Sequence, residues 1–149
     1  MKVGDACNRE VVVVERNASV RDAARLMRDF HVGDLIVVES GEGRRRPVGI
    51  LTDRDIVVGV LARDVDTESV AVQDVMGGEL VTATEDESLL DAVKRMRAAG
   101  VRRTPVVDQD GTLIGILTVD DLLDLLSETL SDLTRLVSRE ISREQRRRK

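Results

Sequence analysis

The sequence predicts an α/β (α+β) fold, in which two β-α-β-β-α repeats related by a pseudo-twofold axis pack as one module and a C-terminal helix follows. The first observation behind this prediction is a repeated motif: GILTDRD at residues 49–55 returns as GILTVDD at residues 115–121. The second is size, because units of roughly 60 residues rarely bury enough apolar surface alone and usually pack on a sister copy. A cleft between the two halves is then the expected ligand site.

The duplication extends well beyond this motif. AARLM at residues 23–27 matches AVKRM at residues 92–96 with an offset of 69 residues, whereas the GILT motifs follow at an offset of 66. The first copy therefore carries three additional residues, which we place in a loop over residues 40–47. We set the boundaries at residues 3–64 for the first repeat, 72–126 for the second, and 127–149 for a C-terminal amphipathic helix with a basic end.

Both repeats begin with the same two elements. Short apolar runs at residues 11–14 and 80–83 are typical of strands. Ser19 and Ser88 are each followed three residues later by Asp, and this pattern predicts a capping box that begins a helix. Apolar residues then recur at helical spacing and indicate a buried face: Val20, Ala23, Ala24, Met27 and Phe30 in the first repeat, and Leu89, Ala92, Val93 and Met96 in the second.

The second half of each repeat predicts a hairpin and another helix. Buried strands are expected at residues 35–38 and 48–51, and again at 105–107 and 113–117, with turn residues between the strands of each pair. A helix begins after Thr52 and after Thr118. The first of these helices has apolar residues on nearly all sides over residues 55–61, which predicts a second buried surface and a homodimer.

The C-terminal segment has no counterpart in the repeats. Leu130, Leu133, Leu136, Val137 and Ile141 form an amphipathic stripe before the basic end at residues 146–149. One interpretation is a helix whose basic end suits its own dipole. The other is a helix that docks on a partner or on an anionic surface.

The composition excludes several classes of function. The chain has 149 residues, a formal net charge of -5 and a pI near 5.0, which argues against general nucleic-acid binding because that needs a basic face. No apolar run approaches the roughly 20 residues of a membrane span, and the start lacks a secretory signal. We therefore expect a cytoplasmic protein, which also suits a single cysteine, Cys7, that cannot form an internal disulfide.

Two Thr-x-x-Asp motifs carry the chemistry. Thr52 with Asp55, and Thr118 with Asp121, can be read simply as capping boxes. Each motif, however, also follows a strand directly and begins a helix, where backbone N–H groups and a hydroxyl suit a phosphate. One turn later, the Asp carboxylate can accept two hydrogen bonds from a vicinal diol such as a ribose. Each motif therefore supplies half of a nucleotide site.

With these motifs the sequence resembles a tandem pair of CBS (cystathionine beta-synthase) domains, a Bateman module. The resemblance covers residues 3–126 and includes VGD at residues 3–5, GVRRTPVVDQDG at residues 100–111 and both GILTxxD motifs. It implies a stand-alone sensor that requires no cofactor, binds AMP, ADP, ATP, S-adenosylmethionine or NAD between the repeats, and signals to an unknown protein partner in trans. It also implies a disc-shaped homodimer. The alternative is a structural adaptor that has kept the fold and has no nucleotide ligand.

The resemblance implies two binding sites, each built across both repeats. The first takes Thr52 and Asp55, with the adenine near Met76, Val81 and Val101 and the backbone of Arg102 and Arg103. The second takes Thr118 and Asp121, with Cys7, Val12, Val32, Gly33 and Asp34. Because Phe30 is the only aromatic residue, the adenine is expected between aliphatic side chains.

The charges of the two sites differ. Arg54, Arg102 and Arg103 belong to the first site, whereas Asp120 and Asp34 take the matching positions in the second. Guanidinium groups favour a di- or triphosphate, and carboxylates repel one. We therefore expect phosphates in the first site, and a neutral or cationic adenosyl group, or nothing, in the second.

Other functions have little support in the sequence. His31 is the only histidine, so no nucleophile–histidine arrangement is available for catalysis, and a metal site would have only lone ligands. Cys7 reads as a small core residue in preference to a redox sensor. Three consecutive arginines at residues 44–46, which could contact nucleic acid, read as part of a solubilising loop.

Overall fold

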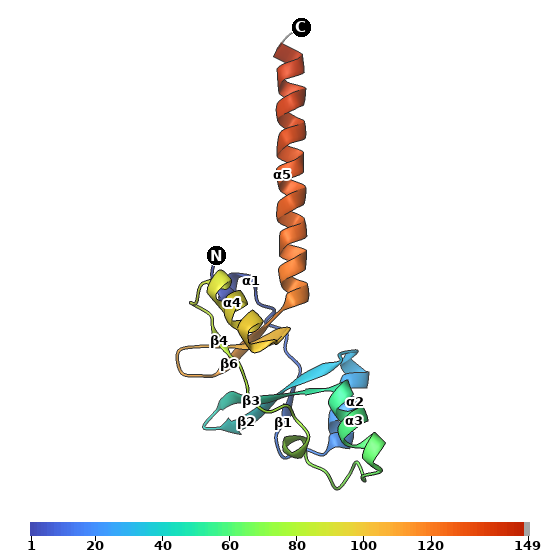
Figure 1. Cartoon of the computed structure of the whole chain (residues 1–149). Coiled ribbons are helices and arrows are strands. Elements are labelled where there is room, and N and C mark those ends of the chain that lie inside the picture. Colours follow the sequence, from blue (N-terminus) through green and yellow to red (C-terminus); the bar gives the residue numbers. More distant parts are fainter. Residues whose placement is uncertain (148–149) are drawn as a thin grey trace.

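A computed structural model describes residues 1–147 of the chain. It contains two three-stranded sheets with helices packed on them, and one long helix that projects away from this body (Figure 1). The predicted mixed α+β fold with two equivalent halves is confirmed. Within residues 1–147, no helix combines the length and the apolar character that crossing a membrane requires.

The first sheet has the strand order β1-β2-β3, with β1 parallel to β2 and β2 antiparallel to β3. Helix α2 connects β1 to β2, and helix α3 follows β3 directly. A 3-10 turn, η1, comes after α3. The elements are β1 (Val13–Glu15), α2 (Val20–Phe30), β2 (Asp34–Gly41), β3 (Arg44–Thr52), α3 (Asp53–Gly59) and η1 (Leu61–Arg63).

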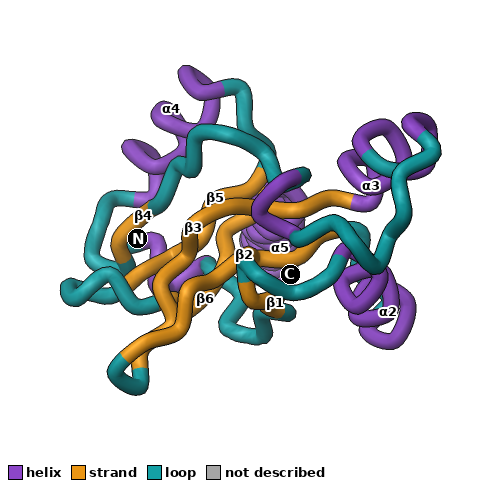
Figure 2. The backbone as a smooth tube through the Cα atoms, turned by 90° about the horizontal axis from the view of Figure 1, so that it is seen from below, coloured by secondary structure: helices purple, strands orange, loops and turns teal. Residues whose placement is uncertain are grey.

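The second sheet repeats this arrangement with the order β4-β5-β6. Strands β3 and β6, which contain the GILT motifs, contact each other, so the two sheets meet along these strands (Figure 2). The last helix runs on from β6 without a break. The elements are β4 (Ala83–Thr84), α4 (Leu89–Ala99), β5 (Arg103–Val107), β6 (Leu113–Thr118) and α5 (Val119–Arg147).

The segment at the start of each repeat packs on the other half of the molecule. Helix α1 (Val3–Ala6) lies on the second repeat, where Val3 N–H donates to Glu87 O at 2.9 Å. The 3-10 helix η2 (Val72–Asp74) lies on the first repeat, where Val72 N–H donates to Ala18 O at 2.9 Å. Val3 and Val72 are both fully buried, each in the core of the opposite repeat. Neither core is therefore complete without a segment from the other half.

Helix starts and buried faces follow the sequence pattern in part. Ser19 Oγ accepts from Asp22 N–H at 3.1 Å and caps α2 as expected. Ser88 makes no side-chain cap on α4, so the predicted capping box there is wrong. Of the residues predicted to be buried, Ala24 is exposed and Phe30 is 59% exposed. At 3.6 residues per turn these two residues lie on the two flanks of the face that Val20, Ala23 and Met27 bury.

The hairpin of the first repeat is longer than predicted. Residues 44–46 lie in strand β3, with Arg46 opposite Glu39 and Arg44 opposite Gly41, so the predicted arginine loop is wrong. The turn consists of Glu42 and Gly43, both with positive φ (53° and 74°). Such a two-residue turn matches the twist of an antiparallel pair. Pairing between the two strands therefore begins directly at Arg44.

Residue 127, where we set the start of the C-terminal helix, lies inside a longer helix. Helix α5 continues from Val119 to Arg147, so the helix after Thr118 and the C-terminal amphipathic helix are one element of 29 residues. No glycine or proline interrupts this segment, and leucine, glutamate and arginine all favour helix. Residues 148 and 149 of the predicted basic end lie outside the described residues.

Candidate functional site

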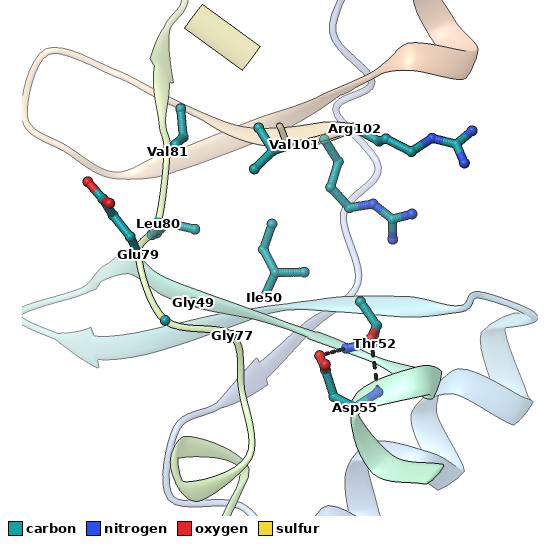
Figure 3. A pocket seen from close by; sticks show the side chains of 12 residues that line it. Gly49, Ile50, Thr52, Asp55, Gly77, Glu79, Leu80, Val81, Val101 and Arg102 are labelled. Carbon is teal, nitrogen blue, oxygen red and sulfur yellow. Dashed lines mark hydrogen bonds between the residues drawn. The ribbon is translucent and has the colours of Figure 1, made fainter. Parts of the chain in front are cut away.

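A cavity of about 290 Å³ lies between the two repeats (Figure 3). Its walls come from the end of β3 and the start of α3, from the segment before β4, and from the residues at the start of β5. Its volume is at the lower end of the range for small-molecule sites. The lining residues are Gly49, Ile50, Thr52, Asp55, Gly77, Gly78, Glu79, Leu80, Val81, Val101, Arg102 and Arg103.

Thr52 and Asp55 hold each other at the edge of this cavity. Thr52 N–H donates to Asp55 Oδ2 at 2.9 Å, and Asp55 N–H donates to Thr52 Oγ1 at 3.1 Å. This capping box fixes both side chains on the wall. A carboxylate offers about four acceptor positions, so Asp55 can accept further hydrogen bonds while it caps α3. The capping and binding interpretations are therefore compatible.

The equivalent pair in the second repeat differs in one hydrogen bond. Thr118 Oγ1 donates to Asp121 Oδ2 at 2.6 Å, in addition to the two backbone bonds of the capping box. Thr52 Oγ1 donates no hydrogen bond to any residue in the described part of the chain. The first site therefore offers a hydroxyl donor to a ligand, whereas the hydroxyl hydrogen of Thr118 is already used.

An ion pair connects the two halves of the molecule. Arg103, at the start of β5, pairs with Asp34, at the start of β2, and their side chains are 31% and 25% exposed. Arg103 lines the first cavity and Asp34 lines a second one. Arg102 is largely exposed, with Nη2 3.9 Å from Asp120 Oδ1. The carboxylate of Asp34, which lines the second cavity, therefore partly neutralises the positive charge of Arg103 in the first cavity.

Two residues expected in the first site do not line its cavity. Arg54 is exposed on α3, outside the lining residues. Met76 packs with the first core, and a Cβ atom at Gly49 would lie 2.5 Å from Met76 Sδ. The glycine of the GILT motif is therefore needed for this close approach, and Met76 supports the cavity from beneath its wall.

The second cavity is smaller, at about 160 Å³. Four of the residues expected there line it, namely Val12, Val32, Asp34 and Thr118, together with Asn8, Glu10, Val11, Ile36 and Ile116. Cys7, Gly33 and Asp121 do not. Cys7 Sγ would lie 3.0 Å from a Cβ atom at Gly115, so Cys7 packs on this strand as Met76 does on its counterpart. Partial burial raises the pKa of the Cys7 thiol, which suits packing better than thiolate chemistry.

The difference in size has a local cause. The repeat offset places Gly77 and Gly78 where the first copy has Asn8 and Arg9. Asn8 closes on β6 through two backbone hydrogen bonds with Ile116, at 2.9 and 2.8 Å. Gly77 makes one such bond, at 3.1 Å to Ile50 O, and carries no side chain. The glycine pair therefore leaves room in the first cavity, whereas Asn8 lines the second cavity.

A buried hydroxyl fixes the wall of the first cavity. In the first repeat, Ile36 N–H donates to Val12 O at 3.1 Å. The second repeat has Pro105 at the position of Ile36, and proline has no N–H to donate. The hydroxyl of Thr104, which is 1% exposed, donates instead to Val81 O. Thr104 thus replaces the missing ladder bond and holds Val81 in place.

The remaining candidates do not gather into a reactive site. His31 is exposed and ends α2 with a left-handed backbone (φ 53°), at the position that Gly100 takes in the second repeat. Among residues 1–147, no group of three or more His, Cys, Asp or Glu side chains is arranged to hold a metal ion.

Sequence reasoning missed the segment at residues 77–80. It supplies one entire wall of the first cavity, with Glu79 at the side away from Arg102 (Figure 3). A signal was present, because two consecutive glycines stand opposite Asn8 and Arg9 in the alignment of the repeats. Among the residues before β1 that line the second cavity, Asn8 and Glu10 were not predicted, and Val11 was assigned to a strand over residues 11–14.

Comparisons with known proteins agree with this architecture. The family model described as CBS domain matches residues 3–61 and 72–128. The CBS domain-containing protein YhcV of Bacillus subtilis is 38% identical over 80% of this chain and 81% of its own length. The uncharacterized protein MK0525 of Methanopyrus kandleri is 33% identical over 84% of this chain, which spans 62% of that protein.

A solved structure adds information on ligands. The CBS domain pair of protein MJ0100, crystallised in complex with methylthioadenosine and S-adenosyl-L-methionine, is 26% identical in sequence to this chain. The two structures have a TM-score of 0.72, over 87% of this chain and 98% of that one.

Proposed function

This chain belongs to the CBS domain family, and on that premise we propose that it is a regulatory protein that binds an adenosine-containing ligand in the first cavity. The candidate ligands are AMP, ADP, ATP, S-adenosylmethionine and NAD. The main support is the convergence of Thr52, Asp55 and two arginines on one cavity between the repeats. The adenosyl ligands of the similar MJ0100 pair support the same class of ligand.

The cavity offers a distinct environment for each part of such a ligand. Asp55 accepts the ribose hydroxyls, because its carboxylate keeps acceptor capacity beyond the capping box. The adenine lies among the aliphatic side chains of Ile50, Leu80, Val81 and Val101. Thr52 Oγ1 and Arg102 are the donors for a phosphate, on the side away from Glu79 (Figure 3). Charge therefore orients the ligand with its phosphates toward Arg102.

We propose that phosphates bind only to the first cavity. Arg102 and Arg103 line it, whereas Glu10 and Asp34 line the second. Carboxylates repel a phosphate, and a volume of about 160 Å³ is below the usual range for ligand pockets. A polyphosphate nucleotide is therefore expected to bind with one site per chain, and the second cavity to accept a neutral or cationic adenosyl group or no ligand.

The alternative is a structural adaptor with this fold and no nucleotide. A thermal-shift panel of AMP, ADP, ATP, S-adenosylmethionine and NAD distinguishes the two, because a ligand that binds only the folded form raises the melting temperature. We expect a shift that Asp55→Ala abolishes and Asp53→Ala preserves, since Asp53 is outside the cavity lining but on the same helical turn. A panel without any shift would favour the adaptor, whereas equal shifts in both variants would show that the ligand does not bind through Asp55.

We also propose that the protein is a homodimer and that it signals in trans to a separate protein partner. Helices α2 and α3 contact each other. Phe30, Val57 and Val58 on these helices and Leu61 on η1 are more than half exposed, at 59%, 53%, 54% and 56%. An apolar surface of this kind is typical of an interface. Light scattering at micromolar concentration is expected to give at least a dimer, and a monomer would contradict this proposal.

A further inference from the structure

Helix α5 carries an apolar stripe that no other residue in the described part of the chain covers. From Leu126 to Glu144 every residue is exposed, and the helix projects away from both sheets (Figure 1). Helices outside a tertiary context are marginal in water, and most owe their stability to a packed apolar face. Seven large apolar side chains on α5 are 52–63% exposed: Leu123, Leu126, Leu130, Leu133, Leu136, Val137 and Ile141.

The spacing of this stripe is that of a helix–helix seam. Leu123, Leu126, Leu130, Leu133 and Val137 alternate at intervals of three and four residues. This is the a/d pattern of a coiled coil, in which the apolar side chains of one helix fit between those of another helix. A single facing helix is therefore the occupant that the stripe fits.

The charges of α5 are separated along its length. Residues 119–134 contain five acidic residues and no basic one, whereas residues 135–147 contain five arginines and two glutamates. Such a helix complements a second helix of the same sequence only when the two run in opposite directions. A parallel copy would place acidic beside acidic and basic beside basic.

We propose that α5 pairs antiparallel with α5 of a second copy of this chain. One register pairs the four central residues of the stripe, with Leu126 opposite Val137 and Leu130 opposite Leu133 in the seam, and sets Leu123 level with Glu140 at each end. The same register sets acidic and basic residues at equal height: Asp120 with Arg143, Asp124 with Arg139, and Glu128 with Arg135. These charged residues do not touch across the seam, so the orientation is favoured only by the overall attraction between the acidic half of one helix and the basic half of the other, while the apolar layers hold the pair.

A membrane surface fits α5 less well than a second copy. Interfacial helices carry lysine and arginine along the polar face. On α5 the first half of that face carries Asp124, Glu128 and Asp132, which anionic lipids would repel. Membrane binding is accordingly an outcome that would contradict the proposal.

Disulfide trapping tests the orientation directly. Cys7→Ser removes the only native cysteine, and Leu126→Cys and Val137→Cys are then introduced in separate chains. Antiparallel pairing sets residue 126 level with residue 137 of the other copy, so a mixture of the two variants should cross-link on a non-reducing gel. Two copies of residue 126 lie about 16 Å apart along the axis, beyond the roughly 7 Å that a disulfide can bridge, so neither variant should cross-link alone. Cross-linking of either variant alone would show a parallel pair and overturn the proposal.

A second measurement tests whether the stripe drives association. In a Val57→Asp background, which disables the α2–α3 surface, the double variant Leu130→Glu and Leu133→Glu is expected to halve the particle mass in light scattering, whereas Ser131→Glu, which adds charge outside the stripe, should leave it unchanged. The body should stay folded in both, since these residues are exposed and lie beyond it. An unchanged mass in the double variant, or stripe-dependent binding to phosphatidylglycerol vesicles without cross-linking, would overturn the proposal. Val57→Asp, on the α2–α3 surface, should not affect the cross-links, so failure of either interface can be recognised separately.

Discussion

Replacing Asp34 by alanine should tighten the binding of a phosphate ligand, although Asp34 does not line the cavity that binds it. Asp34 pairs with Arg103, and Arg103 lines the first cavity. A phosphate must therefore compete with the Asp34 carboxylate for this guanidinium. In Asp34→Ala the competitor is removed, and the full charge of Arg103 faces the ligand.

The partial exposure of the pair sets the size of this effect. Arg103 is 31% exposed and Asp34 is 25% exposed, so solvent screens their interaction, and pairs of this kind are worth at most about 1 kcal/mol. That free energy corresponds to about fivefold tighter binding of ATP. Arg103→Ala should instead lose a charge-assisted hydrogen bond of about 1.5–3 kcal/mol, which is roughly 10- to 150-fold in affinity. The double variant should resemble Arg103→Ala, because the released charge is then absent.

Calorimetric titration with ATP at two salt concentrations measures these effects. The gain in Asp34→Ala should shrink at higher salt because it is electrostatic. Asp29→Ala is the matched control, since it removes the same net charge at the exposed end of α2 and outside the first cavity. Unchanged or weaker binding in Asp34→Ala, or an equal gain in Asp29→Ala, would refute the proposed competition for Arg103.

Three further predictions concern stability and reactivity. Thr104→Val should lower the free energy of unfolding by about 1–3 kcal/mol in urea titrations, because the buried Val81 carbonyl loses its donor; a loss below 0.5 kcal/mol would contradict this estimate. His31→Gly should raise it by about 1 kcal/mol, since a left-handed backbone strains any residue with a Cβ atom, and a decrease would argue against strain there. Cys7 should react slowly with iodoacetamide near pH 7, with a midpoint above that of a model thiol, because burial raises its pKa. The raised pKa also means that stability falls as the pH rises past the unfolded thiol's pKa, and fast alkylation at pH 7 would contradict the packing role.

Local patterns predicted most of the fold. The two Thr-x-x-Asp motifs and Ser19 marked helix starts correctly, because capping is decided within four residues. Duplication then located the interface between the repeats. Ser88 failed as a cap because its side chain makes no cap hydrogen bond. Residues 44–46 failed as a loop because a two-residue turn leaves no spacer between the strands.

The candidate site was harder to predict because one wall of the first cavity is formed in part by residues without side chains. Gly77 and Gly78 contribute space and not a side chain, and the pairing of Arg103 with Asp34 joins residues from different repeats. The family resemblance assigned Met76 and Cys7 to the two binding sites, but their side chains pack against Gly49 and Gly115. Tertiary packing decides such orientations, and one repeat read alone does not contain that information.

The most direct test of the central proposal is the stoichiometry of adenine nucleotide binding. Calorimetric titration of AMP, ADP, ATP and S-adenosylmethionine into the wild-type chain should show at least one saturable ligand, and a polyphosphate should bind with one site per chain. Asp55→Ala should weaken that site by about 1.5–3 kcal/mol, while Asp121→Ala should leave it unchanged. Two equal ATP sites per chain, equal affinity in wild type and Asp55→Ala, or no saturable binding of any of the four compounds would contradict the account.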